Sequence, residues 1–175
     1  AGVVLYINST AAAKAVADTC CTSSNAIRVT ERMPQREIIF APDRNLASWV
    51  AQHTSKTIIP ADGFCPTHER ITVADIAAAR SAHPEAVIMV HPECPPEVVA
   101  AADKVFSTGE MVAYAATANE KTIIVGTESG IIHRLQKAAP GTAFLPLTRD
   151  FICQNMKKIT PEKILHALET DFGLV

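Results

Sequence analysis

Two short segments of this 175-residue chain each place a cysteine just before a predicted helix. GFCPTHERIT contains Cys65, with His68 three residues later, and FICQNMKKIT contains Cys153. A thiol at a helix start suits metal binding, because free backbone amides and the helix dipole stabilise the thiolate. Soft thiolates select iron–sulfur clusters, zinc or copper. Two thiolates are too few for a zinc site or a cubane cluster, so these residues alone do not identify a cofactor.

The remaining three cysteines are weaker candidates. Cys20 and Cys21 lie in TCCTS, which has the composition of a buried strand, so we expect both to be small core residues. Cys94 follows the segment HPE and fits a ligand or a core residue equally well. Five cysteines, an odd number, and a start without a basic, apolar leader favour reduced thiols in the cytoplasm over a disulfide framework.

Acid–base chemistry is best supported by the segment HPEC. His91 and Glu93 follow an apolar run, where they can transfer protons or bind a carboxylate, although a helix-start loop with a capping glutamate has the same pattern. Ser23 and Thr108 each begin a predicted helix, where hydroxyls and free amides bind phosphate or carboxylate, or only cap the helix. His68 fits a ligand, a base or an ordinary loop residue. The other histidines are expected on the surface: His53, His83, His133 and His166.

The elements that must position these residues alternate between short apolar runs and alanine-rich stretches. Continuous apolar runs are typical of parallel strands that are covered on both faces. We predict strands at 3–8, 19–23, 37–41, 57–61, 86–91, 104–108, 122–126 and 143–147. We predict helices at 11–18, 45–54, 73–83, 95–103, 130–139 and 161–169. Thr72 with Asp75 forms a capping box, and Thr160 before Pro161 is an N-cap. The fold class is therefore α/β, with right-handed βαβ crossovers.

The chain also repeats itself. Residues 3–29 line up with 86–112, and residues 37–54 line up with 122–139. Equivalent residues lie 85 positions apart in three pairs and 88 apart in a fourth: Asp18 and Asp103, Ser23 and Thr108, Asp43 and Glu128, and Cys65 and Cys153. We infer two similar α/β domains, at 1–84 and 85–175. Polar residues that follow parallel strands gather at one sheet edge. Five residues are therefore expected around one cavity: Cys65, Cys153, His68, His91 and Glu93.

Composition excludes several classes of protein. The chain is 48% hydrophobic and 19% charged, which is a globular composition. A net charge of −2, the lack of a basic run and few aromatic residues argue against nucleic-acid binding. Apolar runs are far shorter than the roughly 18 residues that a membrane span needs. No Walker loop or dinucleotide-binding glycine pattern is present, which argues against ATP or NAD as a cofactor.

Six segments together resemble the quinolinate synthase A family, in order along essentially the whole chain. They are YIN…TSSNA, GFCPTHERIT, HPECPPEVV, STGEM, GTESGIIHRL and CQNMKKIT. The resemblance implies three similar α/β domains arranged pseudo-symmetrically around a central active-site cavity, of which this chain matches the second and third. It implies a 4Fe–4S cluster held by three cysteines, one from each domain. It also implies condensation of iminoaspartate with dihydroxyacetone phosphate to quinolinate, a precursor of NAD, and a functional link to L-aspartate oxidase.

The resemblance also assigns roles to residues of this chain. Cys65 and Cys153 would be two of the three cluster ligands, and the third would come from the first domain. Tyr6, His91 and Glu93 would be catalytic and would contact substrate. Asn8, Ser23 and Thr108 would bind substrate, and His68 and Met156 would line the cavity near the cluster. The cluster would act as a Lewis acid.

Two other readings of the residues stay open. The first is a two-domain α/β module that binds a small carboxylate or phosphate without a metal. The second is a zinc hydrolase that uses His68, His91 and Glu93, although the sequence has no HExxH-type spacing.

Overall fold

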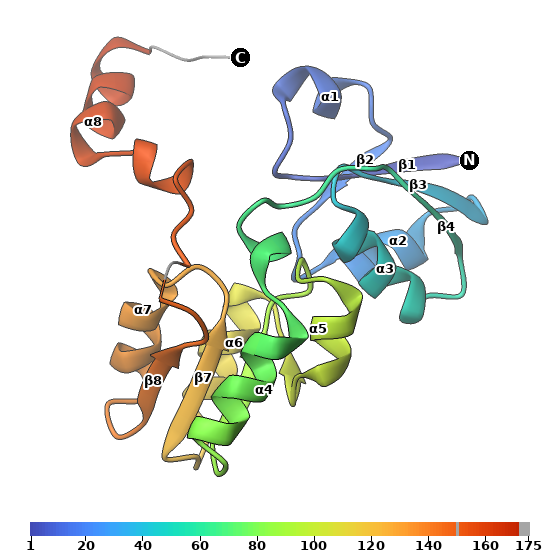
Figure 1. Cartoon of the computed structure of the whole chain (residues 1–175). Helices are drawn as coiled ribbons and strands as arrows, with labels where there is room; N and C mark the ends of the chain where they lie inside the picture. Colours follow the sequence, from blue (N-terminus) through green and yellow to red (C-terminus); the bar gives the residue numbers. More distant parts are fainter. Residues whose placement is uncertain (150, 172–175) are drawn as a thin grey trace.

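The computed structural model describes residues 1–149 and 151–171 and contains two parallel four-stranded sheets flanked by helices (Figure 1). All eight predicted strands are present, so the α/β fold class is confirmed. The first sheet contains β1 (Gly2–Tyr6), β2 (Thr19–Cys21), β3 (Glu37–Ala41) and β4 (Thr57–Pro60). The second contains β5 (Val87–Val90), β6 (Lys104–Val105), β7 (Thr122–Gly126) and β8 (Ala143–Pro146).

The two sheets have the same topology. Their strand orders are β2-β1-β3-β4 and β6-β5-β7-β8. The Asp18 carboxylate accepts a hydrogen bond from the backbone N–H of Val3 at 2.7 Å, and the Asp103 carboxylate accepts one from Ile88 at 2.8 Å. The two donors, Val3 and Ile88, are 85 residues apart, and so are the two acceptors, as the repeat requires. In this register Tyr6 is the counterpart of His91, which places the two side chains at equivalent strand ends.

The helices that the periodicity predicts are also present. The described helices are α1 (Ala11–Ala15), α2 (Ala26–Arg32), α3 (Arg44–Gln52), α4 (Val73–Ala82), α5 (Pro96–Ala101), α6 (Thr108–Ala115), α7 (Ile131–Ala138) and α8 (Pro161–Thr170). Two 3₁₀ turns, η1 (His68–Arg70) and η2 (Met156–Lys158), precede α4 and α8. The capping box of Thr72 and Asp75 forms as predicted, and Thr160 caps α8.

Two helices, α2 and α6, are absent from the predicted helix ranges, which give only a helix start near each. α6 starts at Thr108 as expected, and its N-cap is Ser107, which forms a capping box with Glu110. α2 starts only at Ala26, because Asn25 first closes a turn in which its side chain accepts the backbone N–H of Thr22. Ser23 therefore lies in a turn before the helix and not at its N-cap.

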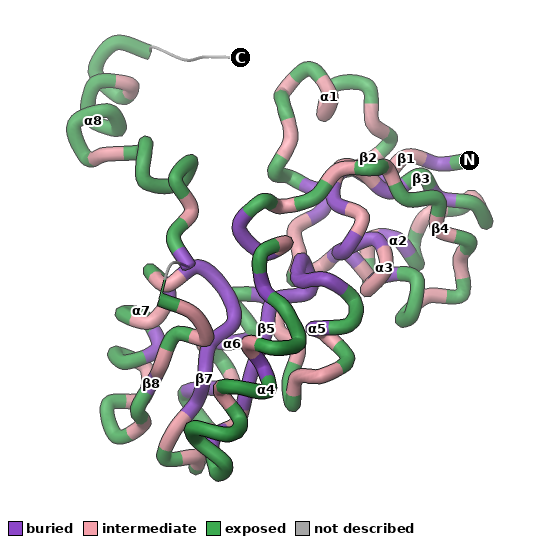
Figure 2. The backbone as a smooth tube through the Cα atoms, in the orientation of Figure 1, coloured by how far each residue is buried: buried purple, intermediate pink, exposed green. Residues whose placement is uncertain are grey.

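α4 packs against the second sheet although it follows the first in sequence. Its residue Ile76, together with Ile71 from the preceding loop, belongs to the core cluster that contains Ile88, Val90 and Val98. Figure 2 shows this continuous buried region around β5 and β7. Packing thus groups α4 with the second sheet, although the proposed domain boundary at residues 84 and 85 follows this helix. Residues 150 and 172–175 of the expected second domain lie outside the described residues.

α8 is the repeat counterpart of α4 but projects away from the second sheet (Figure 1). Ile71 and Ile76 are 2% and 3% exposed, whereas their counterparts 88 residues later, Ile159 and Ile164, are 67% and 51% exposed. Figure 2 shows the helix almost entirely exposed. The apolar face of α8 therefore has no packing partner among the described residues.

The first sheet has the complementary feature, an uncovered apolar face. Ile39 and Ile59 are neighbours in the register of β3 and β4, and they are 38% and 42% exposed. Their counterparts on the second sheet, Ile124 and Leu145, lie in or against the core cluster that α4 completes. Among the described residues, no helix covers this face of the first sheet as α4 covers that of the second.

The expectation that both adjacent cysteines of β2 are core residues is half wrong. Cys21 is buried against α2 and α3, but Cys20 is exposed. Successive side chains of a strand point to opposite faces, so Cys20, which pairs with Leu5, lies on the face opposite Cys21. Cys94 is fully buried in the core of the second sheet. Among the described residues, no helix is long and apolar enough to cross a membrane.

Candidate active site

The carboxyl ends of strands from both sheets surround one cavity. It has two adjoining lobes of about 550 and 510 Å³ that share much of their lining. The second lobe is lined by all ten residues to which the family resemblance assigns a role: Tyr6, Asn8, Ser23, Cys65, His68, His91, Glu93, Thr108, Cys153 and Met156. The convergence expected from the repeat is therefore present in the structure.

Glu93 lies at the centre of the polar groups in this cavity. Its side chain is buried, and its Oε2 atom lies 3.2 Å from His91 Nδ1, 3.3 Å from the Tyr6 hydroxyl and 3.6 Å from His68 Nδ1. Burial alone would raise the pKa of this carboxyl, but the hydrogen bond and positive charge of His91 outweigh it and lower the pKa below the ordinary value. Glu93 is therefore ionised at neutral pH.

His91 connects the two halves of the chain. Its Nε2 lies 3.3 Å from the Ser23 hydroxyl of the first half. Its Nδ1 lies near both the Glu93 carboxylate and, at 3.3 Å, the backbone N–H of Glu93. A protonated Nδ1 donates to the carboxylate, and an unprotonated Nδ1 accepts from the backbone, so the ring keeps a partner in both states. This arrangement suits a group that gains and loses a proton.

His68 is buried beside His91, with the two rings stacked at a centroid distance of 4.8 Å. Burial, together with the neighbouring His91, lowers the pKa of His68 to about 4. The imidazole is therefore neutral at pH 7. Its Nε2 lies 2.9 Å from the Thr127 hydroxyl, while its buried Nδ1 has no hydrogen-bond partner.

Tyr6 brings a phenol from the end of β1 to the same carboxylate. Its hydroxyl donates to Glu93 and accepts from the Asn8 side chain at 3.0 Å. Burial and the negative charge of Glu93 raise the pKa of Tyr6 well above its usual range. The phenol therefore stays protonated and can serve as a hydrogen-bond donor or a general acid.

Asp43 fixes the loop that carries Cys65. One carboxylate oxygen caps α3 by accepting from Leu46 N–H at 2.7 Å, and the other accepts from Cys65 N–H at 2.9 Å. Burial raises the pKa of Asp43 to about 6, even though these backbone hydrogen bonds act in the opposite direction. The acid named from the repeat thus positions the backbone of the neighbouring cysteine.

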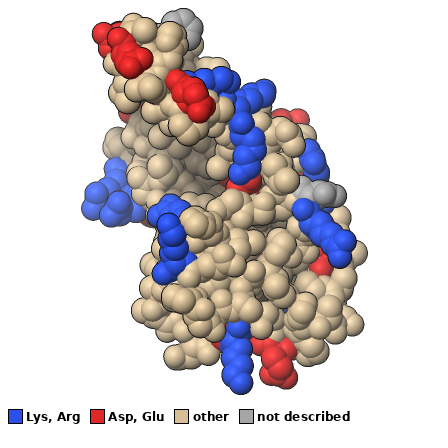
Figure 3. Space-filling view, turned by 90° about the vertical axis from the view of Figure 1, so that its left-hand side faces the viewer, with Lys and Arg blue, Asp and Glu red and all other residues tan. Residues whose placement is uncertain are grey.

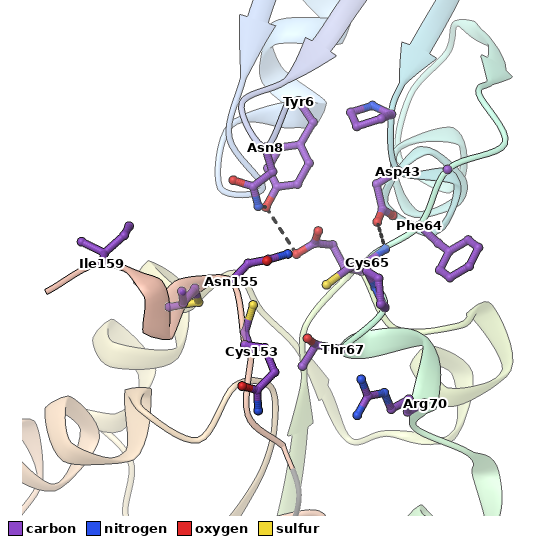
Figure 4. A pocket seen from close by; sticks show the side chains of 16 residues that line it. Tyr6, Asn8, Asp43, Phe64, Cys65, Thr67, Arg70, Cys153, Asn155 and Ile159 are labelled. Atoms are coloured by element: carbon purple, nitrogen blue, oxygen red, sulfur yellow. Dashed lines mark hydrogen bonds between the residues drawn. The ribbon is translucent and has the colours of Figure 1, made fainter. Parts of the chain in front are cut away.

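Cys65 and Cys153 both direct their sulfur atoms into the cavity (Figure 4). Both are partly exposed, unlike the buried Cys21 and Cys94. Each precedes a 3₁₀ turn, and equivalent hydrogen bonds close the two turns, from Glu69 N–H to the Cys65 carbonyl and from Lys157 N–H to the Cys153 carbonyl. Burial raises the pKa of the Cys65 thiol, so a bound cation is needed to hold it as a thiolate.

Basic side chains and the first residue of a helix also line the second lobe of the cavity. Arg134 and Lys157 join Thr108, which is the first residue of α6. Lys157 Nζ lies 3.0 Å from the Glu128 carboxylate. Figure 3 shows one face of the molecule, with a hollow bordered by lysine and arginine side chains. These groups favour an anionic ligand.

Sequence reasoning missed two residues that support this site. Asn45, in the first turn of α3, donates to the Glu93 carbonyl at 3.0 Å and to the Glu69 carboxylate at 2.8 Å. Nothing in the local pattern distinguishes this asparagine from a surface helix residue. Thr127, the partner of His68, directly follows β7, so the rule that strand ends line the site was sufficient to find it.

Comparisons with known proteins agree with this geometry. A family model described as quinolinate synthetase A protein matches residues 1–173. The quinolinate synthase of Thermodesulfovibrio yellowstonii is 49% identical over 170 residues, which cover 97% of this chain and 56% of the relative. Those of Dehalococcoides mccartyi and Methanoregula boonei are 48% and 46% identical, over 95% and 97% of this chain and 55% and 56% of the relatives. The chain thus spans little more than half the length of these relatives, and it belongs to the quinolinate synthetase A family.

Proposed function

We propose that the intact protein is a quinolinate synthase that condenses iminoaspartate with dihydroxyacetone phosphate to quinolinate in NAD biosynthesis. The observation that carries this proposal is that all ten residues matched to the family motifs line one cavity. Identities of 46–49% to proteins named quinolinate synthase support it further.

The cysteines of the cavity fit an iron–sulfur cluster in part. Cys65 and Cys153 occupy repeat-equivalent loops and face the same space (Figure 4). Among the described residues no third cysteine lines this cavity, because Cys21 and Cys94 are buried elsewhere and Cys20 faces outward. We propose that the third ligand comes from a further α/β unit. A 4Fe–4S cluster held by Cys65, Cys153 and this third thiolate would supply a Lewis acid to the cavity.

The residues around Glu93 suit the proton transfers of a condensation. Glu93 is ionised and accepts a proton, and His91 passes protons between the carboxylate and the cavity. Tyr6 stays protonated and donates to a developing oxyanion or a leaving hydroxyl. We therefore assign catalytic roles to Tyr6, His91 and Glu93, as the resemblance implies.

The anionic groups of both substrates need positive partners. Ser23, Thr108 and Asn8 offer hydroxyl and amide groups, and Arg134 and Lys157 add positive charge to the same lobe. His68 and Met156 complete the wall near the cysteines. We propose that these residues orient carboxylate and phosphate groups around Glu93.

A further α/β unit also explains two exposed apolar surfaces. α8 exposes the residues that α4 buries on the second sheet, and the first sheet exposes the face that α4 covers on the second. A unit of the same type placed between them would receive α8 and supply a helix to the first sheet. The uncovered part of the relatives, a little less than half their length, has room for such a unit.

The proposed substrates also suggest a location and a functional partner. Free thiols that must hold an iron–sulfur cluster suit the cytoplasm. Iminoaspartate must be supplied by an enzyme that oxidises aspartate, so we propose a functional link to L-aspartate oxidase.

Quinolinate formation by the intact-length protein, prepared without oxygen, tests the proposal. Glu93→Gln keeps the size of the side chain but removes the base, and it should lower the rate by about 10²–10⁴-fold. Glu97→Gln, an exposed residue of α5, is the matched control and should have no effect. Equal rates in both variants would refute the catalytic role of Glu93. Dicarboxylate binding without turnover, retained after both Cys65→Ser and Cys153→Ser, would favour a binding module without a metal.

A further inference from the structure

We propose that Cys65, His68 and Glu93 form a binding site for a single borderline transition-metal ion, such as Zn²⁺, which occupies the cavity in place of the cluster. Its ligand set is one thiolate, one imidazole and one carboxylate. The site does not depend on quinolinate synthesis, so it can be tested on this chain directly.

The three side chains already lie close to the required separation. One potential ligand atom from each lies within 4.8 Å of the other two. His68 Nδ1 and Glu93 Oε2 are 3.6 Å apart. Zn–N, Zn–O and Zn–S bond lengths in a tetrahedral site place ligand atoms about 3.3–3.7 Å apart. The nitrogen–oxygen pair matches this spacing as it stands, and the partly exposed Cys65 side chain needs to close by at most about 1 Å.

His68 supplies the independent sign of a missing ligand. Its Nδ1 is buried, lacks a hydrogen-bond partner and faces the Glu93 carboxylate. Its Nε2 is engaged by the Thr127 hydroxyl at 2.9 Å. A proton on Nε2, donated to Thr127, leaves the lone pair of Nδ1 free for a metal. Metal-binding histidines characteristically hold their second nitrogen in this way.

Glu93 is also held in position by neighbouring side chains. His91 and Tyr6 both contact Oε2, and Asn45 holds the backbone carbonyl of Glu93 at 3.0 Å. The fourth metal position faces the cavity, since Cys65 and Glu93 both line it. Three protein ligands with one open position are the pattern of a zinc site that binds water or a small anion.

The choice of metal follows from the donor atoms. A site with one sulfur, one nitrogen and one oxygen donor suits Zn²⁺, Co²⁺ or Fe²⁺ better than Mg²⁺ or Ca²⁺, which prefer oxygen ligands only. Because Cys65 is also a proposed cluster ligand, an ion bound here and a cluster exclude each other. The inference therefore adds a competing metal state to the same cavity.

Titration of the reduced, metal-free 175-residue chain with Co²⁺ tests the site. We expect one ion per chain, the visible bands of four-coordinate cobalt, a thiolate-to-cobalt charge-transfer band and release of about one proton as the thiol ionises. Cys65→Ser should abolish the charge-transfer band. Thr127→Val, which only frees the His68 ring, should weaken affinity by about 10- to 100-fold, and His68→Gln should weaken it further.

Cys20→Ser is the matched control, because Cys20 is an exposed thiol that lies outside the cavity and outside the group of three. It should leave the cobalt spectrum and affinity unchanged. X-ray absorption of the wild-type chain with Zn²⁺ gives a result that needs no variant, and it should show one sulfur ligand. Any one of four results would overturn the proposal. They are two sulfur ligands in the absorption spectrum, loss of binding in Cys153→Ser, unchanged affinity in His68→Gln, and the lack of stoichiometric binding.

Discussion

Ile76 and Ile164 make a matched pair that tests how the repeat packs. Both occupy the equivalent position of an amphipathic helix, 88 residues apart, but Ile76 is 3% exposed on the second sheet and Ile164 is 51% exposed on α8. Isoleucine to alanine at either position removes the same atoms. Alanine has the higher helix propensity, so any loss of stability comes from packing.

The expected magnitudes differ by several-fold. Ile76→Ala opens a cavity among Ile88, Val90 and Val98 and should lower the free energy of unfolding by about 2–5 kcal/mol. Ile164→Ala leaves no cavity in this chain and should change it by about 0.5 kcal/mol or less. In an intact-length protein with the proposed further unit, Ile164→Ala should cost as much as Ile76→Ala.

Urea unfolding is the appropriate assay, followed by far-ultraviolet circular dichroism and by fluorescence. The sole tryptophan, Trp49, packs against the core of the first sheet, so its fluorescence reports that unit. Ile76→Ala should shift the circular dichroism midpoint. Equal free energies of unfolding for the two variants would refute the inference that α4, and not α8, is a core helix of this chain.

Three further predictions follow from the cysteines. Burial raises the pKa of Cys21 to about 12, above its unfolded value near 9, so its stabilising effect is complete below pH 9 and is lost as pH rises toward 12. From pH 9 to 10, wild type should lose about 1 kcal/mol more of its unfolding free energy than Cys21→Ala, and equal losses would contradict burial of this thiol. When the native chain is titrated with a thiol reagent, Cys20 should react first, and Cys21 and Cys94 should stay unmodified until the chain unfolds. Rapid modification of Cys94 in the native chain would contradict its burial. Prior loading of the intact-length protein with Zn²⁺ should slow incorporation of iron and sulfide, and Thr127→Val should relieve this inhibition; an unchanged rate in the zinc-loaded wild type would show that the two states do not compete.

The strands and their order of appearance could be predicted from the sequence because buried parallel strands are continuous apolar runs. The repeat then placed Cys65 and Cys153 at equivalent sheet edges. Both predictions depend on local pattern and on internal similarity, which a single sequence contains.

Packing between distant segments could not be predicted in the same way. The sequence of α4 shows an apolar side but not that it covers the following sheet, since either sheet offers a compatible face. Cys20 and Cys21 lie in a segment whose composition suggests burial. Because side chains alternate between the two faces of the edge strand β2, Cys20 is exposed while Cys21 is buried.

The details of the site depend on the same long-range geometry. From the sequence, His68 fits a ligand, a base or a loop residue. Its stacking on His91 depends on a contact between the two halves of the chain, which the sequence does not show. Asn45 supports Glu93 from a helix 48 residues away, with no local signal of its role.

The most direct test of the central claim is iron and acid-labile sulfide per chain, measured with an electronic spectrum on anaerobically purified protein. The intact-length form should contain about four irons per chain, and Cys65→Ser or Cys153→Ser should remove them, whereas Cys20→Ser should not. The 175-residue chain alone should lack the cluster, because Cys65 and Cys153 are the only cysteines that line the cavity in the part of the chain that the structure describes. Unchanged iron in both the Cys65→Ser and Cys153→Ser variants would contradict the assignment of these two residues as cluster ligands.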